Sequence, residues 1–105
     1  MSEFNPDRFE DKYEHYFTEL QQAYGAAFEA MSERYDSDLI HEIDQLVLRE
    51  SEPLYEGDEF RIAVPADATE RLPDRDSDHV ETVLTEYRTE IATQLRAVFG
   101  LGESS

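Results

Sequence analysis

The chain of 105 residues has no cysteine and no tryptophan, and it has only four glycines, four prolines and one lysine, Lys12. Without cysteine it cannot form disulfides, use a thiolate nucleophile or bind metal through sulfur. With so few glycines it has no glycine-rich loop of the kind that holds phosphates, and no serine lies in a glycine-flanked nucleophile elbow. Several enzyme classes are therefore excluded by composition.

Long apolar stretches are also missing. No run of residues approaches the roughly 20 apolar positions that a membrane-spanning helix needs. The opening residues 1–6 contain neither a basic stretch nor an apolar core, so they do not resemble a secretory leader. We therefore expect a cytoplasmic protein with no membrane partner.

Acidic residues dominate the charge, because 26 Asp and Glu face 9 Lys and Arg and give a net charge of −17. The basic residues form no cluster along the chain, so nucleic acid is not an expected partner. The acids are spread over every segment, and molar salt shortens the Debye length to about 3 Å, which screens their repulsion. We interpret the composition as an adaptation to high salt.

Hydrophobic content is sufficient for folding. Leu, Ile, Val and Phe supply 24 of the 105 residues, with six Tyr besides, and this exceeds the roughly 20% below which chains tend to stay disordered. The length suits one domain. We expect a single domain over residues 1–105 with a frayed tail from about 102.

Helical periodicity predicts three helices. The first covers about 6–33, with Asn5 as its N-cap and apolar residues at helical spacing. It would be about 40 Å long, so the domain is either elongated or shares this helix with a second copy. The second helix covers about 37–50 and the third about 78–99, where Gly100 ends it.

A short β-hairpin is predicted at about 53–64, between the second and third helices. Phe60, Ile62 and Val64 alternate with polar or small residues, and Gly57-Asp58 supplies a two-residue turn. This turn places Tyr55 opposite Phe60, and it places Glu56 opposite Glu59 as a like-charge pair. The expected fold class is therefore mainly α with one small hairpin.

Three segments carry a resemblance to a known family. They are Phe9 to Phe17 (FEDKYEHYF), Ser51 to Asp58 (SEPLYEGD) and the closing Val98-Phe99-Gly100. With these segments the chain resembles an uncharacterised family of small acidic haloarchaeal proteins of unknown function. The resemblance implies a salt-rich cytoplasm, but it brings no activity, substrate or catalytic residues.

Two histidines have an aspartate three positions earlier: Asp38 precedes His41, and Asp76 precedes His79. This spacing puts both groups on one helical face, where they could ligate a divalent metal. With 26 acids in the chain, however, such pairs arise mostly by chance, and aspartates near helix starts have a structural role. We expect no catalytic residue, metal or cofactor, and a small metal-dependent enzyme or metal-binding sensor remains the alternative.

Aromatic residues are the candidates for a protein interface. Those singled out are Tyr13, Tyr16, Phe17, Tyr24, Tyr55 and Phe60. An aromatic stripe at helical spacing usually packs into a core, but aromatic rings are also enriched in interface centres, and a lone hairpin leaves strand edges that could pair. The expected function is a non-enzymatic interaction or scaffold domain that binds a protein partner or itself, as a homodimer.

Overall fold

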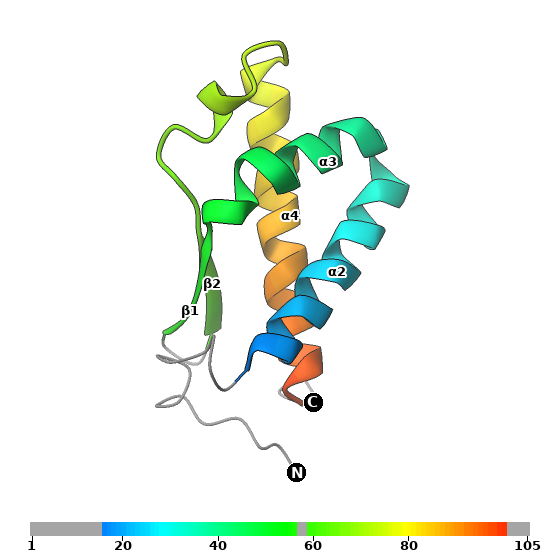
Figure 1. The fold of residues 1–105 in the computed structure, drawn as a ribbon, viewed down its shortest axis with the longest axis vertical. Coiled ribbons are helices and arrows are strands. Elements are labelled where there is room, and N and C mark those ends of the chain that lie inside the picture. The colour runs from blue at the N-terminus through cyan, green and yellow to red at the C-terminus, as the bar shows by residue number, and fades with distance from the viewer. Residues whose placement is uncertain (1–15, 57–58, 101–105) are drawn as a thin grey trace.

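The computed structural model describes residues 16–56 and 59–100, which form three α-helices and one hairpin (Figure 1). The elements in order are α2 (Phe17–Arg34), α3 (Ser37–Leu46), the 3₁₀ helix η2 (Leu48–Glu50), β1 (Glu52–Glu56), β2 (Glu59–Ala63), the 3₁₀ helix η3 (Thr69–Arg71) and α4 (Ser77–Val98). The hairpin lies between the second and third helices, which confirms the predicted fold class.

Helices α2 and α4 run antiparallel along the long axis, and α3 crosses back from the end of α2 toward the hairpin (Figure 1). The hairpin lies on the other side of α4 and packs on it through β2. The described part measures 44 × 24 × 23 Å, so it is elongated.

The core lies where α2, α3 and the hairpin meet α4. The buried residues of α4 recur every three or four positions, as helical periodicity predicts; they are Val80, Val83, Leu84, Tyr87, Ile91 and Leu95. On α2 the buried face includes Ala23 and Ala27, neither of which is exposed. These small side chains let the α2 backbone approach α4 closely.

The first described helix starts later than the sequence suggests. Tyr16 has φ −129° and ψ 24°, outside the helical region, and α2 begins at Phe17. The physical reason is packing, because the buried Tyr16 ring meets the Phe99 ring edge-on at a centroid distance of 4.8 Å. Residues 6–15 of the predicted first helix lie outside the described residues.

The later boundaries are close to prediction. The second helix, predicted to reach residue 50, leaves α-geometry after Leu46 and ends in the 3₁₀ turn η2. This tighter turn allows both Val47 and Leu48 to be buried. Helix α4 starts behind an Asp76 cap, whose Oδ1 accepts the backbone N–H of Asp78 at 3.3 Å. It ends before Gly100, whose φ of 72° suits a glycine.

The hairpin has the predicted register, with Tyr55 opposite Phe60 and Glu56 opposite Glu59. Its strands begin and end one residue before the predicted bounds of 53 and 64, and the turn residues 57–58 lie outside the described part. Arg61 Nη1 approaches Glu56 Oε1 at 3.2 Å, so a cation lies beside the like-charge pair. The strand register is therefore the one that the sequence predicts.

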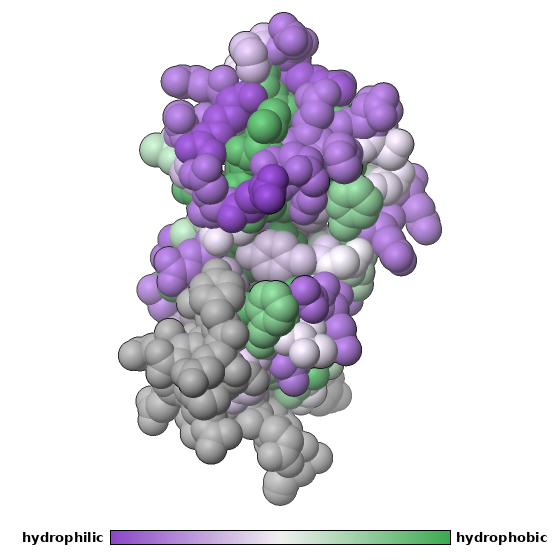
Figure 2. Space-filling model, in the orientation of Figure 1, coloured by the Kyte–Doolittle hydropathy of each residue, from purple (hydrophilic) through white to green (hydrophobic). Residues whose placement is uncertain are grey.

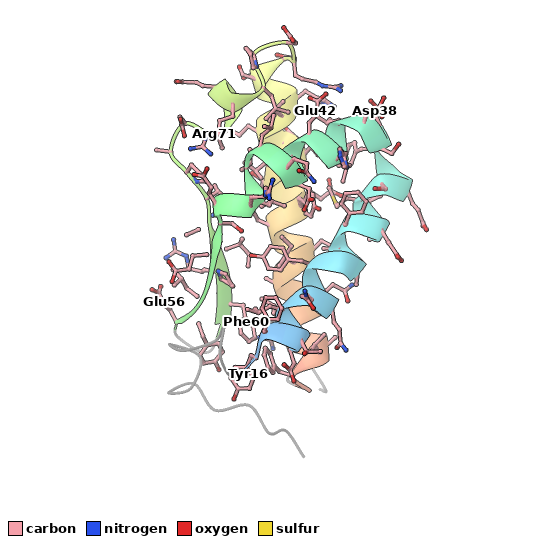
Figure 3. All side chains as sticks on the ribbon, in the orientation of Figure 1. Tyr16, Asp38, Glu42, Glu56, Phe60 and Arg71 are labelled. Carbon is pink, nitrogen blue, oxygen red and sulfur yellow. The ribbon has the colours of Figure 1, made fainter. Side chains whose placement is uncertain are left out.

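An aromatic end cluster closes the end of the domain where α2 begins and α4 ends (Figure 3). It consists of Tyr16, Tyr55, Phe60 and Phe99. The Phe99 ring meets Tyr16 at 4.8 Å and stacks on Phe60 at 5.8 Å, and Phe60 meets Tyr55 at 4.9 Å. The cluster therefore joins α2, the hairpin and α4 through four rings from three separate segments of the sequence.

Arginine side chains tie the loops to the helices. Arg75, just before α4, donates from Nε and Nη2 to both carboxylate oxygens of Glu42 at 3.1 Å, a two-point geometry that favours charge-assisted bonding. This bonding holds the pKa of the Glu42 carboxyl below its usual value. At the far end of α2, Arg34 bridges Glu86 and Glu90 of α4. The few basic residues thus hold elements together.

Tyr87 is the one large core side chain of the described part whose hydroxyl has no hydrogen-bond partner there, although the residue is fully buried. A buried hydroxyl without a partner costs desolvation energy. We therefore expect Tyr87→Phe to raise the free energy of unfolding by about 1 kcal/mol, measured by denaturant titration in molar KCl. A loss of stability would contradict this and would indicate that the hydroxyl is satisfied in solution.

Candidate functional site

The four candidate metal ligands lie on the surface and in two separate groups. Asp38 and His41 are exposed on α3, and the His41 ring contacts Phe28 edge-on at 6.4 Å (Figure 3). Asp76 and His79 are exposed at the start of α4. Asp76 is occupied as the helix cap, and the His79 ring faces Tyr35 at 6.1 Å. Asp76 and the two histidines therefore each have a structural contact, and Asp38 is exposed in the first turn of α3.

Acidic groups do not converge on any centre in the part of the chain that the structure describes. Within residues 16–56 and 59–100, no three His, Asp or Glu side chains come together in a way that could hold a metal ion. Every Asp and Glu in these ranges is at least partly exposed, which agrees with the polar surface in Figure 2. The metal-dependent alternative gains no support from this arrangement.

The candidate interface residues separate into two groups. Tyr16 and Phe60 are buried, and Tyr55 is half-buried, so all three belong to the aromatic end cluster. Tyr13 lies outside the described residues. Phe17 and Tyr24 remain, and they come to the surface on the same side of α2. Of the candidates in the described part, Phe17 is exposed and Tyr24 is partly exposed beside it, so these two define the candidate contact surface.

Phe17 and Tyr24 border an apolar hollow of about 210 Å³ between α2 and the start of β1. We call this region the Phe17 surface; its lining residues are Phe17, Leu20, Gln21, Tyr24, Leu48, Arg49, Ser51 and Pro53. The side chain of Phe17 is 52% exposed, which makes it one of two large exposed apolar residues in the described part. Green atoms interrupt the polar surface on the face shown in Figure 2.

A hydrogen-bonded chain fixes the floor of the hollow. Ser51 Oγ donates to the Leu48 carbonyl at 2.7 Å, so the Tyr24 hydroxyl, 3.0 Å from Ser51 Oγ, is the donor in that contact. Nearby, burial raises the pKa of the Asp44 carboxyl, and burial together with the Asp44 charge raises the pKa of the Tyr87 hydroxyl. The two hydrogen bonds join α2 to the segment between η2 and β1 at the bottom of the hollow.

Among the described residues, no carboxylate lines the Phe17 surface, although acids supply 26 of the 105 residues. The arrangement offers an exposed ring, apolar walls and a few hydrogen-bonding groups. These are features of a contact surface.

A second feature was missed by sequence reasoning. Arg61 of β2 and Arg88 and Arg96 of α4 line one groove, although they are not clustered along the chain. A helical signal was present, because Arg88 and Arg96 are eight positions apart and so share a face of α4. The contribution of Arg61 depends on how the hairpin packs on α4, which the sequence does not show.

Comparison with known proteins gives a family but no function. No curated protein and no solved structure matches the chain. Within the described residues, no helix has the length and apolar character needed to cross a membrane. One family model, described as a family of unknown function (DUF5783), matches residues 1–102. Because this match spans nearly the whole sequence, the chain belongs to the family of unknown function DUF5783.

Proposed function

We propose that this chain is a non-enzymatic protein-interaction domain that self-associates through the Phe17 surface. The observation that carries the proposal is the exposure of Phe17, 52% of whose side chain faces solvent beside an apolar hollow. Burying a phenylalanine side chain is worth about 1.5–3 kcal/mol, and the site leaves most of this gain unused in the monomer.

Charge favours a second copy as the occupant. A chain with net charge −17 repels its own copies unless they meet where carboxylates are absent, and the Phe17 surface has none among its lining residues. Two copies related by a twofold axis bring the same patch together, so each Phe17 ring can enter the hollow of the other copy. Contact between two copies at this surface therefore places apolar groups against each other and does not place its lining carboxylates, of which there are none, against each other.

Light scattering over a range of protein concentrations in molar KCl tests the proposal. We expect a monomer–dimer equilibrium, and we expect Phe17→Ser to weaken it by about tenfold or more, because each twofold-related site loses a buried ring. The matched control is Leu46→Ser, which removes the other large exposed apolar side chain, 44% exposed, from outside the hollow. Leu46→Ser should leave the equilibrium unchanged.

Two results would contradict self-association at this site. One is a strict monomer at millimolar concentration. The other is an equal loss of dimer in Phe17→Ser and Leu46→Ser, which would mean that general surface hydrophobicity drives association.

A further inference from the structure

A polar groove of about 600 Å³ runs between α4 and β2, away from the Phe17 surface. Its polar lining comes mainly from three arginines and three threonines: Arg61, Arg88 and Arg96, with Thr85, Thr89 and Thr93. Phe60, Ile62 and Ala92 supply apolar lining. The volume falls within the roughly 300–1,000 Å³ of small-molecule sites, and a few polar groups over an apolar floor is the usual construction of such sites.

Arg88 is held in place by the backbone of β2. Its Nε donates to the carbonyl oxygen of Ile62 at 2.8 Å, and the side chain is half-buried. This bond fixes the plane of the guanidinium and leaves the two Nη groups as donors. A fixed guanidinium fork loses little conformational freedom when it binds a planar or tetrahedral oxyanion.

The charge of Arg88 is unusual in its setting. Arg34, Arg61, Arg71 and Arg75 each make an ion pair with a carboxylate. Arg88, like the exposed Arg49, makes none with any residue in the described ranges, and its hydrogen bond there is to the Ile62 carbonyl. In a chain with 26 acidic residues, a half-buried arginine beside a groove without a carboxylate partner leaves a positive site for an external anion.

The lining of the groove is richer in arginines than in carboxylates, although the chain is strongly negative. Three arginines and one carboxylate, that of Glu59, line it, and Arg61 is paired with Glu56 beside the groove. Thr85 and Thr93 add hydroxyl groups whose donors are not used by other described residues. Thr89 differs, because its hydroxyl donates to the Thr85 carbonyl at 3.1 Å.

Two macromolecular occupants fit the groove poorly. An added β-strand would need the outward carbonyl of Ile62, which Arg88 already occupies. A long polyanion would extend beyond the arginines and over a surface of a chain whose net charge is −17, where repulsion opposes it. A compact anion meets only the local positive groups, so these observations favour a small ligand.

We propose that this groove binds a small molecule that carries a phosphate monoester, with the phosphate held by Arg88. A phosphate monoester carries about −1.5 to −2 charges at pH 7 and three strong acceptor oxygens, more than a single carboxylate offers to the Arg88 fork and the neighbouring hydroxyls. Its oxygens accept from the Arg88 fork and the Thr85 hydroxyl. The remainder of the ligand lies along the groove toward Ala92, Thr93 and Arg96, over the Phe60 and Ile62 floor.

The test is a titration of the full chain with glycerol 3-phosphate, followed by NMR of the arginine Nε–H groups at moderate salt. We expect saturable shifts at Arg88, with smaller shifts at Arg61, and no saturable shift at Arg34. Glycerol without phosphate should cause none. Succinate tests whether two carboxylates suffice, and a short glutamate peptide tests whether the groove takes an acidic chain.

Variants assign the binding to the groove. Arg88→Gln should weaken glycerol 3-phosphate binding by about tenfold or more, because it removes a charge-assisted contact. Arg88→Lys keeps the positive charge but lacks the guanidinium fork, so its affinity for glycerol 3-phosphate should lie between those of the parent and Arg88→Gln. Since Arg88 also bonds to Ile62, Arg61→Gln on the exposed face of β2 provides a second variant with little risk to folding, and it should weaken binding by about threefold. Arg34→Gln, an equal change in net charge outside the groove, should bind as the parent does.

Several results would overturn the proposal. They are the absence of saturable shifts, an equal loss in Arg34→Gln, and tighter binding of succinate or the glutamate peptide than of glycerol 3-phosphate. Association through the Phe17 surface is measured separately, so failure of either proposal leaves the other standing.

Discussion

In dilute buffer the protein is expected to lose most of its helical circular dichroism signal, and in molar KCl it is expected to keep it. The cause is the net charge of −17 on a domain only 24 × 23 Å in cross-section. At about 0.01 M salt the Debye length is roughly 30 Å, so the charges on opposite sides of the domain repel one another. At about 1 M it is roughly 3 Å, and only neighbouring charges interact.

The described ion pairs cannot offset this repulsion. Most are exposed, such as the pair between Arg61 and Glu56, with side chains 60% and 56% exposed, and exposed pairs contribute about 0–1 kcal/mol each. The acidic residues at the surface outnumber these ion pairs. Salt weakens the attractive pairs and the repulsion together, but the repulsion involves far more charges, so the net effect of salt is stabilising.

A variant with fewer charges separates screening from other effects of salt. Glu29, Glu33 and Glu70 are exposed and make no hydrogen bond or ion pair with other described residues, so changing all three to Gln takes the net charge from −17 to −14 without breaking a described ion pair. We expect this variant to fold at lower KCl concentration than the parent. An unchanged KCl concentration at the midpoint of folding would contradict the electrostatic interpretation of the composition.

Helices and the hairpin were accessible from the sequence because their signals are local. Apolar spacing set the buried face of α4, and Gly57-Asp58 set the register of β1 on β2, which the structure confirms at Tyr55 and Phe60. The bend at Tyr16 was not predicted, because it depends on a ring contact with Phe99, 83 positions later in the chain. The predicted helix boundaries were therefore wrong where a tertiary contact overrides the local conformational preference.

The candidate sites likewise depend partly on local sequence patterns and partly on tertiary contacts. An apolar stripe cannot distinguish a buried Tyr16 from an exposed Phe17, because they are neighbours and the difference depends on what α4 and the hairpin cover. The arginine groove joins Arg61 of β2 to Arg88 of α4, and only packing brings them together. Sequence patterns therefore gave candidates, and tertiary structure selected among them.

Phe99→Ala is expected to lower the free energy of unfolding by about 3–5 kcal/mol, the range for deleting a buried phenylalanine. The side chain is 7% exposed and meets both Tyr16 and Phe60, so the change removes two ring pairs and leaves a cavity where α2, the hairpin and α4 join. Single domains have a total stability of only about 5–15 kcal/mol. This one side chain therefore accounts for a large share of it, measurable by denaturant titration in molar KCl.

Phe17→Ala is the matched control, because it makes the same substitution one residue after Tyr16 but at a side chain that is 52% exposed. At low protein concentration, where association does not contribute, we expect it to change stability by about 0.5 kcal/mol or less, as surface substitutions usually do. Phe99→Leu fills part of the cavity and should fall between the two. If Phe17→Ala and Phe99→Ala lowered the free energy of unfolding equally, the stabilising role of the aromatic end cluster would be contradicted. Only Phe99 makes the ring contacts that join the end of α4 to α2 and to the hairpin.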